Sequence, residues 1–371
     1  MKLIELHILQ SFPVSCLNRD DVGAPKTATF GGVTRARLSS QCLKRAIRLY
    51  ARELRADLFA GERTRKAAQD LAAELLRQNP AESAAQQIAE AVCHSFLSKS
   101  APKKKKKGIE ADAAAEEESE SDTSTLLYFS PSEIECMAKA ITEAKRVKPD
   151  TKDFHDIAAK AVGKAQLKDA ADIAIFGRMV ANEGSLTLEG AGMFGHALST
   201  HRADNDIDFW TAVEDAKQVG DDAGAANMGT IEFTSAVYYR YSALNLTMLR
   251  NERHLKALGV DGQRKVVDAF LRASLLAVPG ARKNSMNAHT LPGYVLGLVK
   301  DTGQPLQLIN AFERPIAPRN KNDGLMDASV AMLKEHHAQM KKTWSIKPVL
   351  EKAIPETDLD SFCKEIVAHV D

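Results

Sequence analysis

A segment rich in arginine and lysine has the side chains needed to bind a polyanion such as a nucleic acid. Between Arg19 and Arg55 the 371-residue chain has nine basic and three acidic residues. The candidate phosphate-binding residues in it are Arg19, Lys26, Arg35, Arg37, Ser39, Gln41, Lys44, Arg45 and Arg48. Ser39-Ser40 supplies a helix cap, so the backbone N–H groups at the helix start would add an anion site. The alternative interpretation is a basic helix face exposed to solvent.

Two adjacent aromatic residues form a second candidate site. Phe209 and Trp210 follow a glycine-rich and polar stretch, and Trp210 is one of two tryptophans in the chain. Exposed aromatic rings can stack on nucleic-acid bases, an interaction of about 1–3 kcal/mol per base. The two rings would then form a stacking wedge. The alternative is that both rings pack in a hydrophobic core.

A group of histidines and aspartates is the third candidate. It comprises His196, His201, Asp204, Asp206 and Asp208, whose side chains suit zinc or another divalent cation. The two histidines are five positions apart, whereas a helical zinc motif places them four apart on one face. We therefore interpret the segment as a polar loop and expect no metal. The sequence contains no GxSxG, Walker A, GxGxxG or kinase motif.

The hydrophobic pattern predicts the elements that would position these residues. Strands are expected at 2–9, 172–179, 231–241 and 294–299, and helices at 41–55, 63–78, 84–97, 131–145, 263–277, 326–340 and 359–370. Residues 11–37 read as a long loop. Ser130, Pro131 and Glu133 predict a capping box at the start of one helix. Strands separated by helices and long insertions predict an α+β fold.

Composition excludes several classes of protein. The chain is 27% charged and 44% hydrophobic, and no apolar run approaches the length of a membrane span. Five scattered cysteines without a CxxC pair argue against a disulfide framework and predict a cytoplasmic protein. The charged stretch near 100–125 is too polar to build a core, so it is expected to be a disordered insertion.

The formal net charge of the chain is +1, which alone would argue against a polyanion partner. The charge is unevenly distributed, however, because the segment from Arg19 to Arg55 has an excess of six positive charges. The rest of the chain then has five net negative charges. A basic surface is compatible with a near-neutral total, so the placement of the charge predicts a polyanion partner.

Several ordered blocks along the chain resemble a known family. They are 15–21 (SCLNRDD), 30–32 (FGG), 35–48 (RARLSSQCLKRAIR), 176–179 (FGRM), 196–201 (HALSTH), 206–213 (DIDFWTAV), 229–235 (GTIEFTS), 239–241 (YRY), 278–281 (VPGA) and 310–313 (NAFE). Together they resemble the CRISPR-associated backbone subunit of Cascade, type I-E (the CasC family, Cas family seven, of the RAMP superfamily).

The resemblance implies an RRM-like (ferredoxin-like) palm with a helical fingers insertion and a protruding thumb, in the shape of a right hand. It divides the chain into a first part of the palm (1–56), fingers (57–171), a palm strand (172–189), a thumb (190–228) and the remainder of the palm (229–371). The aromatic signature of RNA-binding RRM strands is absent from the sequence, so the usual stacking on strand faces is not expected.

The resemblance also implies a function without catalysis or cofactor. Such a subunit binds guide RNA (crRNA), stacks with copies of itself in a helical filament, and presents the guide to target DNA beside other Cascade subunits in antiviral defence. Carried over by motif, Arg19, Lys26, Ser39, Gln41, Lys44, Arg45 and Arg48 would contact the guide. Arg178 and Met179 would lie at a kink of the RNA, and Phe209 and Trp210 would form a thumb wedge that interrupts the guide–target duplex.

Two further points stay open at this stage. Lys139, Lys145, Arg146 and Lys148 are loose candidates for contacts with duplex DNA. The alternative function is a metal-dependent ribonuclease, similar to the backbone subunits of type III effector complexes, with Asp20 or Asp208 as the acidic residue.

Overall fold

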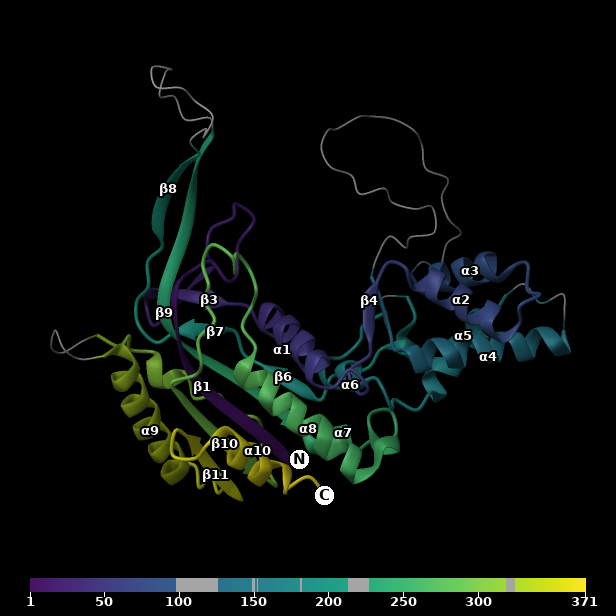
Figure 1. Ribbon diagram of the computed structural model, residues 1–371. Coiled ribbons are helices and arrows are strands. Elements are labelled where there is room, and N and C mark those ends of the chain that lie inside the picture. Colours follow the sequence, from purple (N-terminus) through teal and green to yellow (C-terminus); the bar gives the residue numbers. More distant parts are fainter. Residues whose placement is uncertain (98–125, 149–150, 152, 181, 213–226, 318–323) are drawn as a thin grey trace, which may run out of the picture. The chain divides into compact units, whose positions relative to one another are not determined.

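The computed structural model of the chain contains two compact units, and each has its own hydrophobic core (Figure 1). Unit 1 comprises Met1–Ala51, Met193–Asn245 and Val267–Asp371, and unit 2 comprises Arg52–Gly192 and Leu246–Val266. The structure describes residues 1–97, 126–148, 151, 153–180, 182–212, 227–317 and 324–371. The predicted disordered insertion near 100–125 therefore lies outside the described residues.

Unit 1 is built on an antiparallel sheet. Its strands are β1 (Leu3–Ser15), β2 (Thr27–Phe30), β3 (Val33–Leu38), β6 (Gly192–Phe194), β7 (Ala197–Ser199), β8 (Asp206–Ala212), β9 (Asn227–Asn245), β10 (Tyr294–Lys300) and β11 (Leu350–Ile354). Along the sheet the order is β11-β10-β1-β9-β7-β3-β2, and β6 and β8 also pair with β9. The strands expected at 2–9, 231–241 and 294–299 are confirmed as parts of β1, β9 and β10.

The loop expected over residues 11–37 is wrong for most of its length. β1 continues to Ser15, and β2 and β3 form a hairpin with Phe30 opposite Val33. Its two turn residues, Gly31 and Gly32, have φ values of 60° and 78°. A two-residue hairpin turn of this kind needs positive φ, which glycine adopts without strain. The Gly-Gly pair in the sequence was therefore the signal for this hairpin.

Helices cover both faces of the sheet in unit 1. They are α1 (Ser40–Leu54), α8 (Gly259–Leu276), α9 (Leu325–Thr343) and α10 (Leu359–Val367), with a short η3 (Ile309–Phe312); α1 and α8 continue into the range of unit 2. Leu333 of α9 shares a core with Leu296 and Leu298 of β10. Gly297 between them faces Phe362 of α10 instead. Because successive strand residues point to opposite faces, α9 and α10 lie on opposite sides of the sheet.

Unit 2 is mainly helical. Its elements are β4 (Glu62–Thr64), α2 (Ala67–Gln78), α3 (Ala85–Leu97), β5 (Leu127–Phe129), α4 (Pro131–Val147), α5 (His155–Lys164), α6 (Ala171–Phe176), η1 (Gly184–Leu186), α7 (Leu246–Leu249) and η2 (Lys256–Leu258). β4 and β5 form a small antiparallel pair. The predicted capping box is confirmed, because Ser130 and Glu133 exchange side-chain and backbone hydrogen bonds at the start of α4.

The strand predicted at 172–179 is wrong. Residues Ala171–Phe176 form the short helix α6, which ends at Gly177 with φ of 79°. A short, buried apolar run has the same hydrophobic pattern in a strand and in a buried helix, so the pattern could not separate them. The α+β class is confirmed, whereas the division into palm, fingers and thumb remains a prediction. None of the described helices is long and apolar enough to cross a membrane.

Candidate nucleic-acid interface

The start of α1 and the β2–β3 hairpin position the basic residues that were singled out in the sequence between Arg19 and Arg48. The Ser39 hydroxyl accepts a hydrogen bond from Cys42 N–H at 3.2 Å, so Ser39 caps α1 as expected. Leu43 and Ile47 are buried on one side of the helix, Arg45 is exposed, and Lys44 and Arg48 are half-buried. The amphipathic pattern of the sequence therefore predicted the basic face of α1 correctly.

Lys26 lies beside this helix, immediately before β2. Its carbonyl accepts a hydrogen bond from Arg37 N–H, and its backbone N–H donates to Asn18. Burial raises the pKa of the Cys42 thiol, and both Lys26 and Arg45 oppose that rise, so the two cations lie near the same side chain. Arg19 is exposed just before this point, and Arg37 donates to the Thr27 carbonyl. The structure thus gathers cations from the hairpin and from α1.

The backbone amides at the start of α1 were expected to bind an anion, but atoms of the protein itself accept their hydrogen bonds. Asn18 Oδ1 accepts from Ser39 N–H at 2.8 Å, and His196 Nδ1 accepts from Ser40 N–H at 3.3 Å. Together with the Ser39 cap, these contacts occupy three amides that were expected to bind an anion. The side chains around the helix start, rather than those amides, remain for a phosphate.

Two aromatic side chains lie beside this surface, and neither of them was assigned to it from the sequence. His196 is exposed, and the bond to Ser40 fixes its Nδ1 as an acceptor, so its Nε2 carries the proton. Lys44 Nζ lies 5.2 Å from the ring centroid of Phe194, within the range of a cation–π contact. Both residues come from the segment before β7; from the sequence, His196 was named only as a candidate metal ligand and in the HALSTH block, and Phe194 was not named.

Arg35 does not belong to this surface, which corrects the sequence prediction. Its side chain is fully buried. The guanidinium donates to the carbonyls of Ser199 at 2.9 Å, Phe312 at 2.8 Å and Glu313 at 3.2 Å. Burial lowers the pKa of Arg35. Arg35 therefore holds β3, β7 and η3 together instead of meeting an external phosphate.

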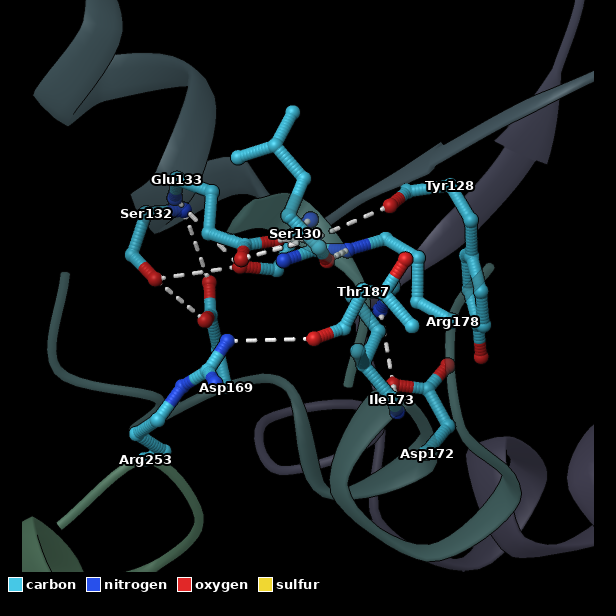
Figure 2. A network of polar contacts seen from close by, with 12 residues as sticks. Tyr128, Ser130, Ser132, Glu133, Asp169, Asp172, Ile173, Arg178, Thr187 and Arg253 are labelled. Carbon is cyan, nitrogen blue, oxygen red and sulfur yellow. Dashed lines mark hydrogen bonds and ion pairs between the residues drawn. The ribbon is translucent and has the colours of Figure 1, made fainter. Parts of the chain in front are cut away.

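Arg178 in unit 2 is a second buried arginine and a second correction (Figure 2). It lies 2.8 Å from Glu133 Oε1, and it also donates to the Leu186 and Tyr128 carbonyls. Burial raises the pKa of Glu133, and the Arg178 charge opposes that rise. The side chain therefore ties α4, β5 and η1 together. Met179, the next residue, is 86% exposed and remains available at the surface of unit 2.

Phe209 and Trp210 lie on the hairpin of β8 and β9, which extends away from the sheet of unit 1 (Figure 1). Their exposed fractions are 59% and 39%, so the alternative that both pack in a core is wrong. Adjacent strand residues point to opposite faces, which puts one ring on each face of the hairpin. The Trp210 ring lies over Gly229, its partner on β9, where any side chain would collide with it.

In the histidine and aspartate group, His201 and Asp204 bond to other groups of the protein. Val237 N–H donates to His201 Nε2 at 3.2 Å, and His201 Nδ1 lies 2.7 Å from the Arg202 carbonyl. Burial lowers the pKa of His201. Asp204 pairs with Arg202 at 3.1 Å. Within the described residues, no group of three or more His, Cys, Asp or Glu side chains is placed to hold a metal ion.

Comparison with known proteins identifies the family of the chain and structures with the same fold. A sequence model of the Cas_CT1975 family, described as CT1975-like protein, matches residues 4–365. The chain belongs to this family. Among curated proteins, no match is found.

Two solved structures resemble the chain over its whole length. One is a chain of a "CRISPR RNA-guided surveillance complex, pre-nicking", with a TM-score of 0.76, 27% sequence identity and coverage of 100% of both chains. The other belongs to a "CRISPR RNA-guided surveillance complex", with a TM-score of 0.67, 25% identity and coverage of 99% of both chains. The architecture described above is therefore that of a subunit found in RNA-guided complexes.

Proposed function

We propose that this protein is a guide-RNA-binding subunit of a Cascade-like surveillance complex. It acts as the type I-E backbone subunit, without catalysis, and copies of it stack along the spacer of the guide. The observation that carries this proposal is the group of cations at the hairpin and on α1, in a chain that belongs to the Cas_CT1975 family. Lysine and arginine contacts to phosphates bind RNA without reading its sequence.

The first test is the salt dependence of RNA binding by Lys44→Ala and Arg48→Ala. Each lost phosphate contact should reduce the slope of log K against log salt by about 0.7 for a single strand. We expect the same loss for guides of different sequence. Lys364→Ala is the matched control, because Lys364 is exposed on α10, which packs on β10 and β11 at the other end of the sheet from β2 and β3. A change in base preference with an unchanged slope would contradict phosphate binding at these positions.

The proposal assigns Phe209 and Trp210 to the paired guide and target. Their exposure on the two faces of a hairpin fits a wedge between neighbouring segments of a guide–target duplex. Replacing both with alanine should leave guide binding intact and weaken target-DNA pairing by the assembled complex. Loss of guide binding in this double variant would place the two rings on the guide strand alone.

The absence of catalysis is tested separately. The purified complex is incubated with complementary RNA, with and without Mg²⁺ or Mn²⁺, and the products are separated on a gel. We expect intact RNA in both cases. Metal-dependent cleavage that Asp20→Ala or Asp208→Ala abolishes would establish the ribonuclease alternative instead.

A further inference from the structure

A hollow at the β11 end of unit 1 has no role in the proposed RNA interface. Its volume is about 780 Å³. One wall is the loop that follows β10, with Pro305 and Leu306, and the other is the end of α9, with Met340, Trp344 and Ile346. In the order of the sheet, β11 and β2 are opposite ends. The hollow is therefore at the other end of the sheet from the β2–β3 hairpin.

A buried ion pair fixes the loop that forms the first wall. Lys300 is 4% exposed, and its Nζ lies 2.9 Å from Glu5 Oε2 and 2.8 Å from the Gln304 carbonyl. Glu5 Oε1 accepts a hydrogen bond from Leu306 N–H at 2.7 Å. Buried pairs contribute little net stability, because removing both charges from water is costly. This pair instead holds an exposed loop in one position, so the hollow is formed in advance.

The second wall presents a large aromatic ring to solvent. Trp344 is 68% exposed at the end of α9. Ile346 N–H bonds back to the Lys341 carbonyl, and Ser345 between them has φ of 52°. This left-handed helix end is usually formed by glycine, so serine here is strained. The chain thus holds Trp344 and Ile346 beside the hollow at a cost in conformational energy.

Lys347 supplies the net charge of the lining, because the charge of Lys300 is neutralised by Glu5. Among the described residues that line it, the charged side chains are Lys300 and Lys347, and none is acidic. Lys342 is exposed in the last turn of α9. Exposed tryptophan beside an apolar hollow is typical of protein interfaces, where a few large side chains provide most of the binding energy. Lys342 and Lys347 add an attraction for negative charge.

We propose that this hollow, which we call the Trp344 hollow, is a docking site for another protein subunit. The ligand is a short acidic segment of that subunit whose apolar side chain inserts between Leu306 and Trp344, while its carboxylates meet Lys342 and Lys347. The inference is independent of the guide-RNA contacts. RNA is disfavoured as the ligand because the charge of Lys300 is already neutralised by Glu5, and the lining is mainly apolar.

The chain has only two tryptophans, Trp210 and Trp344, so replacing Trp210 lets tryptophan fluorescence report on the hollow alone. In a Trp210→Phe background, Trp344 is the sole tryptophan. The probe is the acetylated peptide Gly-Glu-Asp-Leu-Glu-Asp-Gly, added to the subunit bound to guide RNA. We expect a saturable shift of the emission, lost when leucine in the peptide is replaced by serine. The Lys342→Glu/Lys347→Glu variant should weaken binding at least tenfold. An unsaturable response, or a saturable response to oligouridylate instead, would overturn the proposal.

The second measurement uses the assembled complex. Acrylamide quenching of Trp344 is compared between the subunit with guide RNA alone and the complete complex with all its subunits. We expect several-fold protection in the complete complex only. Protection with guide RNA alone would show that a second copy covers the hollow, and no protection in either state would show that it stays open; either result overturns the proposal.

Trp344→Ala should then reduce recovery of the docked subunit in the purified complex. Leu291→Ala is the matched control, since Leu291 is 64% exposed in the same unit. If these variants bind RNA with the normal salt slope, the docking result stands apart from the proposed function.

Discussion

The interior arginines and the surface cations of unit 1 have the same chemistry but different roles. Arg35 and Arg45 are ten positions apart, in one basic segment of the sequence. Arg35 is fully buried and donates to carbonyls of β7 and η3, whereas Arg45 is exposed on α1. The difference teaches that cations of one basic segment can have two roles. Those on the surface are the proposed phosphate ligands, and Arg35 holds together the elements that present them.

Arg178 extends the comparison to unit 2. It too is buried, but its main partner is the carboxylate of Glu133 rather than a set of carbonyls. Removing a buried ion leaves its partner charged and unpaired, which costs more than losing a surface contact. The comparison can therefore be tested by substitutions whose effects should fall in a definite order.

The largest effect is expected for Arg178→Ala. It leaves Glu133 buried without its countercharge, so we expect a loss of about 3–5 kcal/mol in the free energy of unfolding. Urea denaturation followed by circular dichroism measures it. The double variant Arg178→Met/Glu133→Leu should lose much less, because neither charge remains. An equal loss in both variants would mean that packing, and not charge, dominates.

Arg35→Ala should follow, with a loss of about 2–4 kcal/mol, since each buried acceptor left unpaired costs about 1–3 kcal/mol. Arg45→Ala is the matched surface variant and should change stability by less than about 0.5 kcal/mol. It should weaken RNA binding instead. If Arg35→Ala were as stable as Arg45→Ala, the structural role of Arg35 would be wrong.

Acid should reduce the free energy of unfolding of unit 1, by a smaller amount than the two arginine substitutions. Burial, followed by the nearby positive charges of His337 and Lys300, lowers the pKa of His7 from 6.5 to about 3. The unfolded chain binds a proton below pH 6.5, but the folded chain does not until about pH 3, so stability falls as pH falls between these values. From pH 7 to pH 5, His7 should account for about 2 kcal/mol. His7→Asn should remove this part of the pH dependence, as measured by urea midpoints at both pH values.

The smallest expected effect is a gain in stability. Ser345 has the left-handed conformation that glycine adopts freely, so Ser345→Gly should relieve strain at the end of α9 by about 0.5–1 kcal/mol. Differential scanning calorimetry would detect the rise in the melting temperature. A fall would mean that the serine side chain makes a stabilising contact at this turn.

Local signals in the sequence predicted local structure well. The capping box at Ser130 and the basic face of α1 depend on residues within two turns of one another, and both are found in the structure. The short buried run at 172–179 was assigned wrongly, because its pattern is the same in a strand and in a buried helix. Exposure of Phe209 and Trp210 agrees with the wedge interpretation rather than the core.

Long-range contacts could not be predicted in the same way. Nothing near Arg35 or Arg178 in the sequence shows that carbonyls from distant segments would bury them. The same holds for His196, which meets α1 only because β7 pairs with β3. Charge and spacing thus identified the basic surface, but the fold decided which cations stay on it.

The Arg35 contacts also have a consequence for synthesis. The guanidinium and the Phe312 carbonyl are 277 positions apart in the chain. Ribosomes add roughly 5–20 residues per second, so many seconds pass between the appearance of Arg35 and that of its acceptor. The β2–β3 hairpin lacks this one contact until most of the protein has been made. Truncated chains that end before Phe312 therefore lack this contact between the hairpin and η3.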